Sequence, residues 1–277
     1  MWLVFALITA IFWAIGSVLI KKSTIDLHNS VIYFLNASFY LVGWLIYWLL
    51  NGQFIWDPMA VIISILPGLG FIYVLTAFSR AEISLVTSIG SIHAVITALL
   101  AVIFLGEILN FPQVALIAAV IGGVIIMSWP EKIKTSQTAW LKWGIGYGLL
   151  AGTINFLIKL AIDRVNPVSF SLTTAMWQML VALIWLSLSR QKQALKTLKS
   201  KQGQVGLLGT GVFNLGSMSI NLAIGAGSVS LVMPVVNIYV PLLLVLSAWW
   251  LKEKLTLRQI VGAVAVVVCV AWLSLIS

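Results

Sequence analysis

The composition of this chain is that of an integral membrane protein. Of its 277 residues, 61% are hydrophobic and 8% are charged, and the net charge is +9. Too few polar residues are present to cover a water-soluble globule of this length, which excludes a soluble enzyme or soluble binding domain. The single cysteine, Cys269, excludes an internal disulfide and a cysteine-based metal cluster.

Ten apolar windows of about 20 residues follow one another along the chain. The first carries no charge, so we expect it to be retained as a span rather than cleaved as a signal peptide. Runs of this length are helical, because main-chain groups in lipid must be hydrogen-bonded within the helix. The predicted fold is therefore an all-α polytopic membrane protein with ten transmembrane helices, at residues 2–20, 31–50, 59–78, 83–104, 111–129, 141–161, 168–189, 205–224, 230–251 and 257–275.

Basic residues gather on one side of this predicted bundle. Fourteen of the 16 Lys and Arg residues follow the odd-numbered spans, whereas only Lys159 and Arg164 lie in the opposite loops. Cytoplasmic loops of membrane proteins carry such an excess of basic residues. We therefore expect a multi-pass protein of the cell inner membrane with both termini external. Because topology accounts for the net charge, no nucleic-acid partner is expected.

The stretch from residue 77 to 129 is repeated at 223–275. Glu107 and Glu253 fix the register, since 253 − 107 = 146, and His93 falls on Tyr239 at the same offset. Five helices per copy is an odd number, so the second copy must enter the membrane from the opposite side. We therefore predict two inverted five-helix repeats, over residues 1–134 and 135–277.

Both copies carry the same turn before their last span. It reads Glu-x-Leu-x-x-x-Gln at Glu107 and again at Glu253, and each turn ends in a capping pattern, at Asn110 and at Thr256. A structural anchor of the helical hairpin is the favoured role for the glutamates, and an ion-coupling role is the alternative. Small residues spaced four apart in 111–129 suggest either an internal contact or a homodimer through the helices at 111–129 and 257–275.

With these paired turns, the chain resembles the EamA repeats of the drug/metabolite transporter superfamily. Three segments carry the resemblance: LITAIFWAIGSVLIKKS, AFSRAEISLVTSIGSIHAVITALLAVIFLGEILNFPQVALIAAVIGGV and LAIGAGSVSLVMPVVNIYVPLLLVLSAWWLKEKLTLRQIVGAVAVVV. The resemblance implies a secondary carrier that works by alternating access, with the first four helices of each repeat around a central cavity. It leaves the substrate open, because members move amino acids, amines, nucleotide sugars and other metabolites. The centre of the first span has no acidic residue, which argues against proton-coupled efflux of cationic drugs.

Polar side chains at mid-membrane depth are the candidate substrate-binding residues, because each is costly there. His93 is the clearest, and it is explained either as a histidine hydrogen-bonded to a neighbouring helix or by substrate contact or proton coupling. Its repeat equivalent Tyr239 and the nearby Asn237 suggest a shared lining. Trp13 and Trp177 lie near mid-membrane depth, where they would pack or offer a surface for a substrate amine. The remaining candidates lie on four different predicted spans, namely Asn36, Asn155, Gln178 and Asn214.

The sequence therefore predicts a secondary transporter, most simply an exporter of a small metabolite such as an amino acid. A flippase of a lipid-linked substrate and an importer of a small amine or nucleotide-sugar-type solute are alternatives. An intramembrane enzyme would need a second deep titratable group beside His93, and a purely structural subunit would keep its activity when cavity-lining residues are replaced. No cofactor or metal is expected. Lys159 aligns with Lys21 at the end of the first span, and pairing with Asp163 or snorkelling to the surface would accommodate it.

Overall fold

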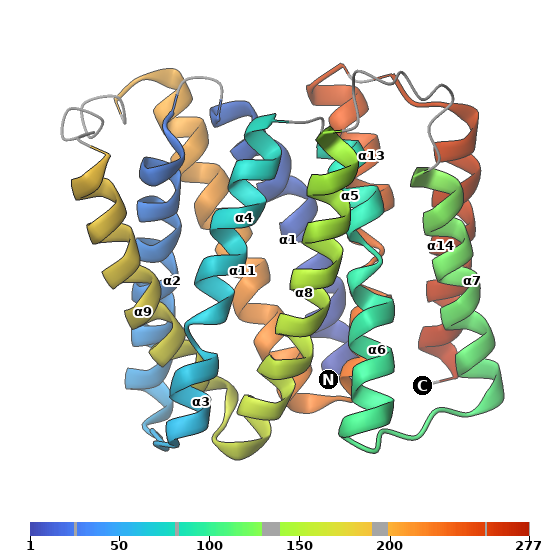
Figure 1. Ribbon diagram of the computed structural model, residues 1–277, viewed down its shortest axis with the longest axis horizontal. Coiled ribbons are helices and arrows are strands. Elements are labelled where there is room, and N and C mark those ends of the chain that lie inside the picture. Colours follow the sequence, from blue (N-terminus) through green and yellow to red (C-terminus); the bar gives the residue numbers. More distant parts are fainter. Residues whose placement is uncertain (25–26, 81–82, 129–138, 190–198, 253, 277) are drawn as a thin grey trace.

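The computed structural model describes residues 1–24, 27–80, 83–128, 139–189, 199–252 and 254–276. These residues confirm the predicted all-α fold: eight helical segments among them are long and apolar enough to span a membrane, and three of the predicted spans are split into two helices (Figure 1). The proposed boundary between residues 134 and 135 lies outside the described ranges. The helices are α1 (Trp2–Ser23), α2 (Asn29–Asn51), α3 (Pro58–Ile63), α4 (Leu66–Arg80), α5 (Ile83–Gly90), α6 (His93–Phe104), α7 (Phe111–Ser128), α8 (Ala139–Arg164), α9 (Pro167–Leu188), α11 (Lys201–Ala226), α12 (Val229–Val236), α13 (Tyr239–Trp250) and α14 (Leu257–Leu275).

The helix boundaries around the fourth span of each repeat reproduce the repeat offset. The ends of α4 and α11, the bounds of α5 and α12, and those of α6 and α13 all differ by 146. In the first two helices of each repeat the offset is 138. Lys21 near the end of α1 aligns with Lys159 near the end of α8, and 159 − 21 = 138. The same offset relates the N-cap of α2, His28, to the N-cap of α9, Asn166. Two residues related by these offsets are called repeat equivalents below.

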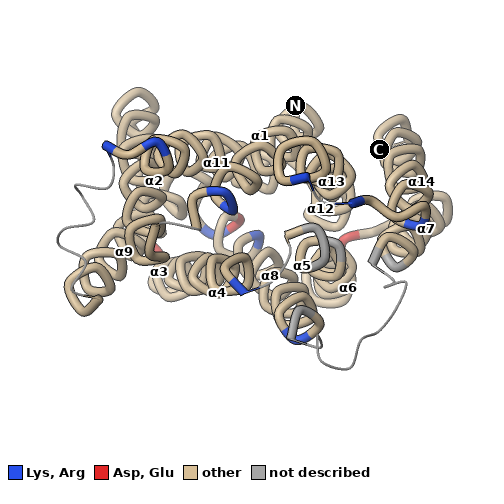
Figure 2. The backbone as a smooth tube through the Cα atoms, turned by 90° about the horizontal axis from the view of Figure 1, so that it is seen from above, with Lys and Arg blue, Asp and Glu red and all other residues tan. Residues whose placement is uncertain are grey.

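The two repeats cross the membrane in opposite directions. In Figure 1, α1 begins at the lower face and α8 begins at the upper face, and both termini lie below. We call the lower side the termini face and the upper side the basic face. Figure 2 looks onto the basic face, where Lys and Arg predominate over Asp and Glu. This arrangement is the inverted topology that an odd number of spans per repeat requires.

The fourth span of each repeat is broken at its centre. The helices α5 and α6 are interrupted at Ser91 and Ile92, and α12 and α13 at Asn237 and Ile238. Pro234 and Pro241 flank the second break, where each removes a main-chain donor. The first break has no proline, so proline is not required for it. Asn237 joins the two breaks, because its Nδ2 donates to the carbonyl oxygen of Ser91 at 3.0 Å.

Glycines let the central helices approach closely. A Cβ on Gly16 of α1 would lie 2.7 Å from main-chain atoms of Phe213 in α11, and one on Gly152 of α8 would lie 2.9 Å from the carbonyl oxygen of His93. The last spans, α7 and α14, pack on each other through Gly123 and Gly262. That pair stands at one end of the bundle (Figure 1). Gly123 of α7 therefore makes an internal contact.

The turn before the last span works as a cap in both repeats. Asn110 and Gln113 exchange side-chain and main-chain hydrogen bonds before α7, and Thr256 and Gln259 do so before α14. Glu107 is an anchor, but it holds the start of α12 in the second repeat rather than its own hairpin. Its carboxylate accepts the main-chain N–H groups of Val229 and Ser230, each at 2.9 Å, and the Ser230 hydroxyl group. The expected role of Glu253 lies outside the described residues.

Candidate functional site

A cavity of about 160 Å³ lies between the two repeats. Its walls come from α1, α2, α4, α5, α6 and α8 together with α9, α11 and α13, so both repeats contribute. The last spans α7 and α14 do not contribute any described lining residue. The cavity is therefore lined by the first four spans of each repeat, with the fifth spans outside it.

The lining follows the repeat symmetry. Many lining residues occur as repeat equivalents, one from each half of the chain. At the 138 offset these pairs are Trp13/Ala151, Ser17/Asn155 and Tyr40/Gln178, and at the 146 offset they are Pro67/Phe213, Phe71/Ser217, Val74/Ile220, Phe78/Ile224 and His93/Tyr239. The cavity is thus centred on the axis that relates the repeats, where the substrate sites of inverted-repeat transporters are found.

Aromatic rings form one wall of the cavity. The Trp13 ring stacks on Phe213 at 5.8 Å between centroids and meets Tyr239 edge-on at 5.9 Å. Phe213 in turn lies 5.4 Å from Phe71. The indole N–H of Trp13 donates to the Ser217 hydroxyl group at 3.1 Å, which fixes the orientation of the ring. This wall offers flat apolar surface to a bound molecule.

His93 begins α6 at the break of the fourth span and is 1% exposed. Its ring lies 6.1 Å from that of Tyr147 and 6.5 Å from that of Tyr239, and the two tyrosine hydroxyl groups are 3.4 Å apart. Neither ring nitrogen of His93 has a hydrogen-bond partner among the described residues. A buried imidazole that lines a cavity and lacks a partner is free to bind a ligand or a proton.

Amide side chains form the opposite polar part of the lining. Asn214 donates from Nδ2 to Asn36 Oδ1 at 2.9 Å, and Asn221 donates to the Tyr40 hydroxyl group at 2.8 Å. Within the described chain, the buried oxygens Asn214 Oδ1 and Gln178 Oε1 have no hydrogen-bond donor. Such acceptors are costly unless a ligand or water satisfies them.

The structure brings most of the sequence-predicted candidates together. Seven of the nine line this cavity, namely Trp13, Asn36, His93, Asn155, Gln178, Asn214 and Tyr239. Asn237 and Trp177 are not among its described lining residues. Asn237 instead joins the two helix breaks, and Trp177 is half-buried on α9.

Sequence reasoning missed several lining residues. Tyr40, Tyr147 and Asn221 contribute polar groups, and Phe71 and Phe213 contribute rings. The repeat was an available signal for Tyr40 alone, because Tyr40 is the equivalent of the candidate Gln178.

No Asp, Glu, Lys or Arg occurs among the described lining residues. Across the described chain, no group of three or more His, Cys, Asp or Glu side chains is placed to hold a metal ion. The cavity lining therefore presents uncharged groups to a ligand, namely aromatic faces, amides, hydroxyl groups and one imidazole.

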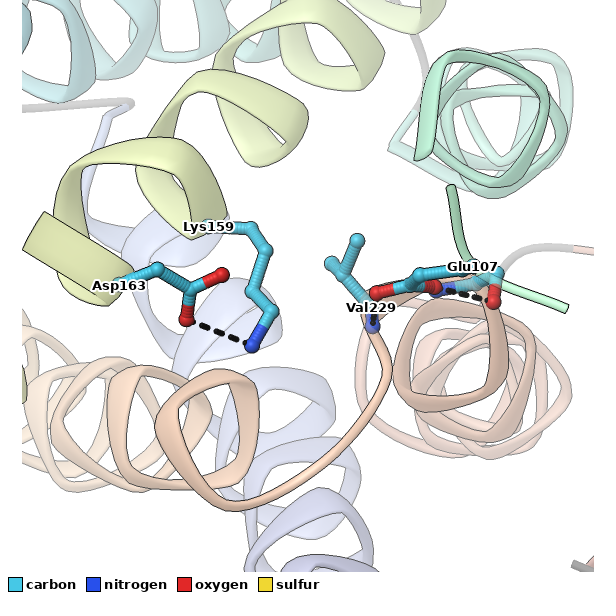
Figure 3. A network of polar contacts seen from close by, with 5 residues as sticks. Glu107, Lys159, Asp163 and Val229 are labelled. Carbon is cyan, nitrogen blue, oxygen red and sulfur yellow. Dashed lines mark hydrogen bonds and ion pairs between the residues drawn. The ribbon is translucent and has the colours of Figure 1, made fainter. Parts of the chain in front are cut away.

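A second hollow, of about 460 Å³, opens at the termini face. Lys159 and Asp163 on α8 lie on one side of it, and Glu107 lies on the other, beside the start of α12 (Figure 3). Lys159 Nζ is 2.8 Å from Asp163 Oδ1, so the predicted pairing is confirmed. On α8 and on α11, the last cavity residues, Ile158 and Ile224, directly precede residues that line this hollow.

Comparison with known proteins agrees with this architecture. A model of the EamA-like transporter family matches residues 1–129 and 138–275. No match was found among curated proteins. A solved crystal structure, described only as that of a protein, is similar over 99% of this chain and 96% of its own, with a TM-score of 0.72 and 14% identity, which shows a shared fold. Because the family model covers nearly the whole sequence, this chain belongs to the EamA-like transporter family, whose members are membrane transporters and not enzymes.

Proposed function

We propose that this transporter exports a small metabolite without net charge, such as an amino acid, by alternating access. The observation that carries the proposal is the neutral, aromatic and amide-lined cavity on the axis between the repeats. A fixed charge on the substrate would need a partner charge in so buried a site. A neutral solute avoids that cost, and a zwitterion needs only hydrogen-bonding partners for its ammonium and carboxylate groups.

The size of the cavity supports a small solute. An apolar protein cavity of about 150 Å³ is large enough to hold benzene, and this one is about 160 Å³. A side chain of that size would lie against Trp13 and Phe213. The amide oxygens of Gln178 and Asn214 would accept hydrogen bonds from an ammonium group, and hydroxyl groups such as that of Ser17 would donate to a carboxylate.

The distribution of basic residues and the access to the cavity support a cellular location and a direction of transport. The excess of basic residues supports a cytoplasmic basic face in the cell inner membrane and external termini. The hollow beside Lys159 then adjoins the central cavity from outside the cell. Release of the substrate to the outside through this hollow would make the protein an exporter. An importer would use the same path in the opposite direction.

Two further features belong to this proposal. Proton coupling through His93 is supported by its buried position in the lining and by its two ring nitrogens without a described partner. Homodimerisation through the outer sides of α7 and α14 is supported by Gly122, where an added Cβ would meet no atom within 4 Å. That open surface is available to a second copy.

A thermal-shift panel on detergent-purified protein tests the substrate class. The panel contains amino acids, polyamines, quaternary amines, nucleotide sugars, sugar phosphates and lipid head groups. A ligand at about a hundred times its Kd stabilises the folded protein by roughly 2.7 kcal/mol, and we expect amino acids to raise Tm. A shift with nucleotide sugars or amines alone would overturn the amino-acid assignment, and a shift with lipid head groups alone would favour a flippase.

A further inference from the structure

Two lysines occupy equivalent positions at opposite faces of the membrane. Lys21 lies in the last turn of α1 and Lys159 near the end of α8, and they are related by the 138 offset. Phe78 and Ile224 are equivalents at the 146 offset, and each lies two residues before the end of its helix, α4 or α11. Both of these residues line the central cavity. The repeat therefore places one lysine and one helix C-terminus at each end of the cavity.

On the basic face, the lysine contacts the helix end. Lys21 Nζ donates a hydrogen bond to the carbonyl oxygen of Phe78. Carbonyl groups in the last turn of a helix lack an intrahelical donor, and they carry the negative end of the helix dipole. An ammonium group donates to such a carbonyl oxygen and is attracted to the negative end of the dipole. The contact ties α1 to α4 across the end of the cavity at that face.

On the termini face, the equivalent contact is not made. Lys159 Nζ donates to Asp163 Oδ1 at 2.8 Å, one turn further along its own helix. Within the described residues it has no hydrogen bond to Ile224. The 460 Å³ hollow is lined by Lys159 (Figure 3) and by Gly225 to Ser228, which form the end of α11 and the turn after it. The lysine side chain is 14% exposed and therefore already lies against the protein.

We propose that Lys21 and Lys159 are positioning residues that latch the two faces in turn. In this structure Lys21 is hydrogen-bonded to Phe78 and the basic face is closed, whereas Lys159 is bonded to Asp163 and the termini face is open. In the opposite state, Lys159 leaves Asp163 and donates to the Ile224 carbonyl oxygen, while Lys21 releases Phe78. Asp163 acts as the competitor that keeps the termini face open. This inference rests on alternating access as the proposed function.

The test measures from which side a cavity cysteine can be reached, and it needs no substrate. The native cysteine is removed by Cys269→Ala, and Ser17→Cys, in the cavity lining, reports access. The protein is reconstituted in proteoliposomes of known orientation, and a membrane-impermeant maleimide is added on one side at a time. Labelling rates are compared for Lys21→Gln, Lys159→Gln, Asp163→Asn and the double variant Asp163→Asn/Lys159→Gln.

Loss of one charged hydrogen bond is expected to change a labelling rate by roughly ten- to hundredfold. Lys21→Gln should raise labelling from the basic face. Asp163→Asn should lower labelling from the termini face, because Lys159 is released to close it, and adding Lys159→Gln should reverse that loss. Lys159→Arg, which keeps a cationic donor, should behave as the parent protein does.

Arg164→Gln is the matched control, because this cation lies on the same face and its guanidinium group is 3.6 Å from Asp57. It should leave both labelling rates unchanged. The latch is wrong if Lys21→Gln and Asp163→Asn leave both rates unchanged, or if Asp163→Asn acts as Arg164→Gln does. Each variant is checked for a parental elution profile, so a misfolded protein is recognised; if Lys21→Gln or Asp163→Asn misfolds, the other variant still tests the latch at its own face. If the variants change the labelling rates as predicted but no compound in the thermal-shift panel raises Tm, the proposed substrate class is wrong and the latch is still supported.

Discussion

Asn237 donates from its side-chain nitrogen to the carbonyl oxygen of Ser91, and the two residues are each other's repeat equivalents, since 237 − 91 = 146. Each lies in the break of a fourth span, 1% exposed. A contact between equivalents lies on the axis that relates the two repeats. The hydrogen bond therefore joins the halves at the centre of the bundle, directly beside His93 and Tyr239.

Replacing Asn237 by Asp should destabilise the protein strongly. The substitution keeps the shape of the side chain, removes the donor and places a carboxylate oxygen against the Ser91 carbonyl oxygen. We expect a loss of about 1–3 kcal/mol, measured as a lower Tm in detergent. Asn237→Ala should cost less, because it also removes Asn237 Oδ1, which has no described partner. Equal stability of the Asp variant and the parent would contradict the bridge, and Asn51→Ala, on an exposed helix end, is the control.

Replacing Glu107 should loosen the start of α12 without changing pH dependence. Glu107→Ala removes the acceptor for two main-chain N–H groups and is expected to cost about 1–2 kcal/mol. Glu107→Gln keeps one acceptor oxygen and should cost less. The pH profile of transport in the Gln variant should match that of the parent protein. A flattened profile would instead assign this residue to ion coupling.

Much of the fold could be predicted from the sequence because two periodic signals were strong. The length of the apolar runs gave the spans, and the 146-residue offset gave the inverted halves. The breaks in the fourth spans were harder to predict. Pro234 and Pro241 marked the second break, whereas the first, at Ser91, has no comparable residue. Its position is recovered only by transferring the second break through the repeat.

The candidate site was partly predictable for a different reason. Buried polar residues in apolar helices stand out, which identified His93, Asn214 and Gln178. Sequence alone does not give the rotation of each helix about its axis, so it could not separate a cavity residue from its neighbour. Gln178 lines the cavity and Trp177, the preceding residue, is not among the described lining. Likewise, Glu107 was expected to serve its own hairpin, but it caps a helix of the other repeat.

Alanine at Gly262 should separate α14 from α7. An added Cβ would lie 2.5 Å from the Gly123 carbonyl oxygen and 2.8 Å from the Met127 main-chain nitrogen, which can yield only by moving a helix. We expect a loss of about 1–3 kcal/mol, seen as a lower Tm. Gly122→Ala meets open space and should be neutral or slightly stabilising. If both variants melted alike, the tight internal contact would be refuted, and a Gly122 variant that changed the oligomer mass would support the dimer.

His93→Gln should remove the proton dependence of transport. Glutamine preserves hydrogen-bonding capacity in the cavity but cannot titrate, so substrate binding in the thermal-shift assay should persist while uptake stops responding to a pH gradient. His28→Gln is the control, because His28 caps α2 at the basic face and lies outside the cavity lining. An unaltered response to the gradient in the His93 variant would exclude it as the coupling residue.

Substrate counterflow in proteoliposomes tests the central claim most directly, because exchange requires a site that is reached from both faces in turn. With the amino acid identified by thermal shift, we predict saturable exchange by the parent protein. Trp13→Ala should weaken apparent affinity about tenfold, or ~1.4 kcal/mol, whereas Trp13→Phe should retain most of it. Trp177→Ala, which changes the same residue type outside the described lining, should exchange normally. Absence of counterflow, or equal effects of Trp13→Ala and Trp177→Ala, would contradict transport through this cavity.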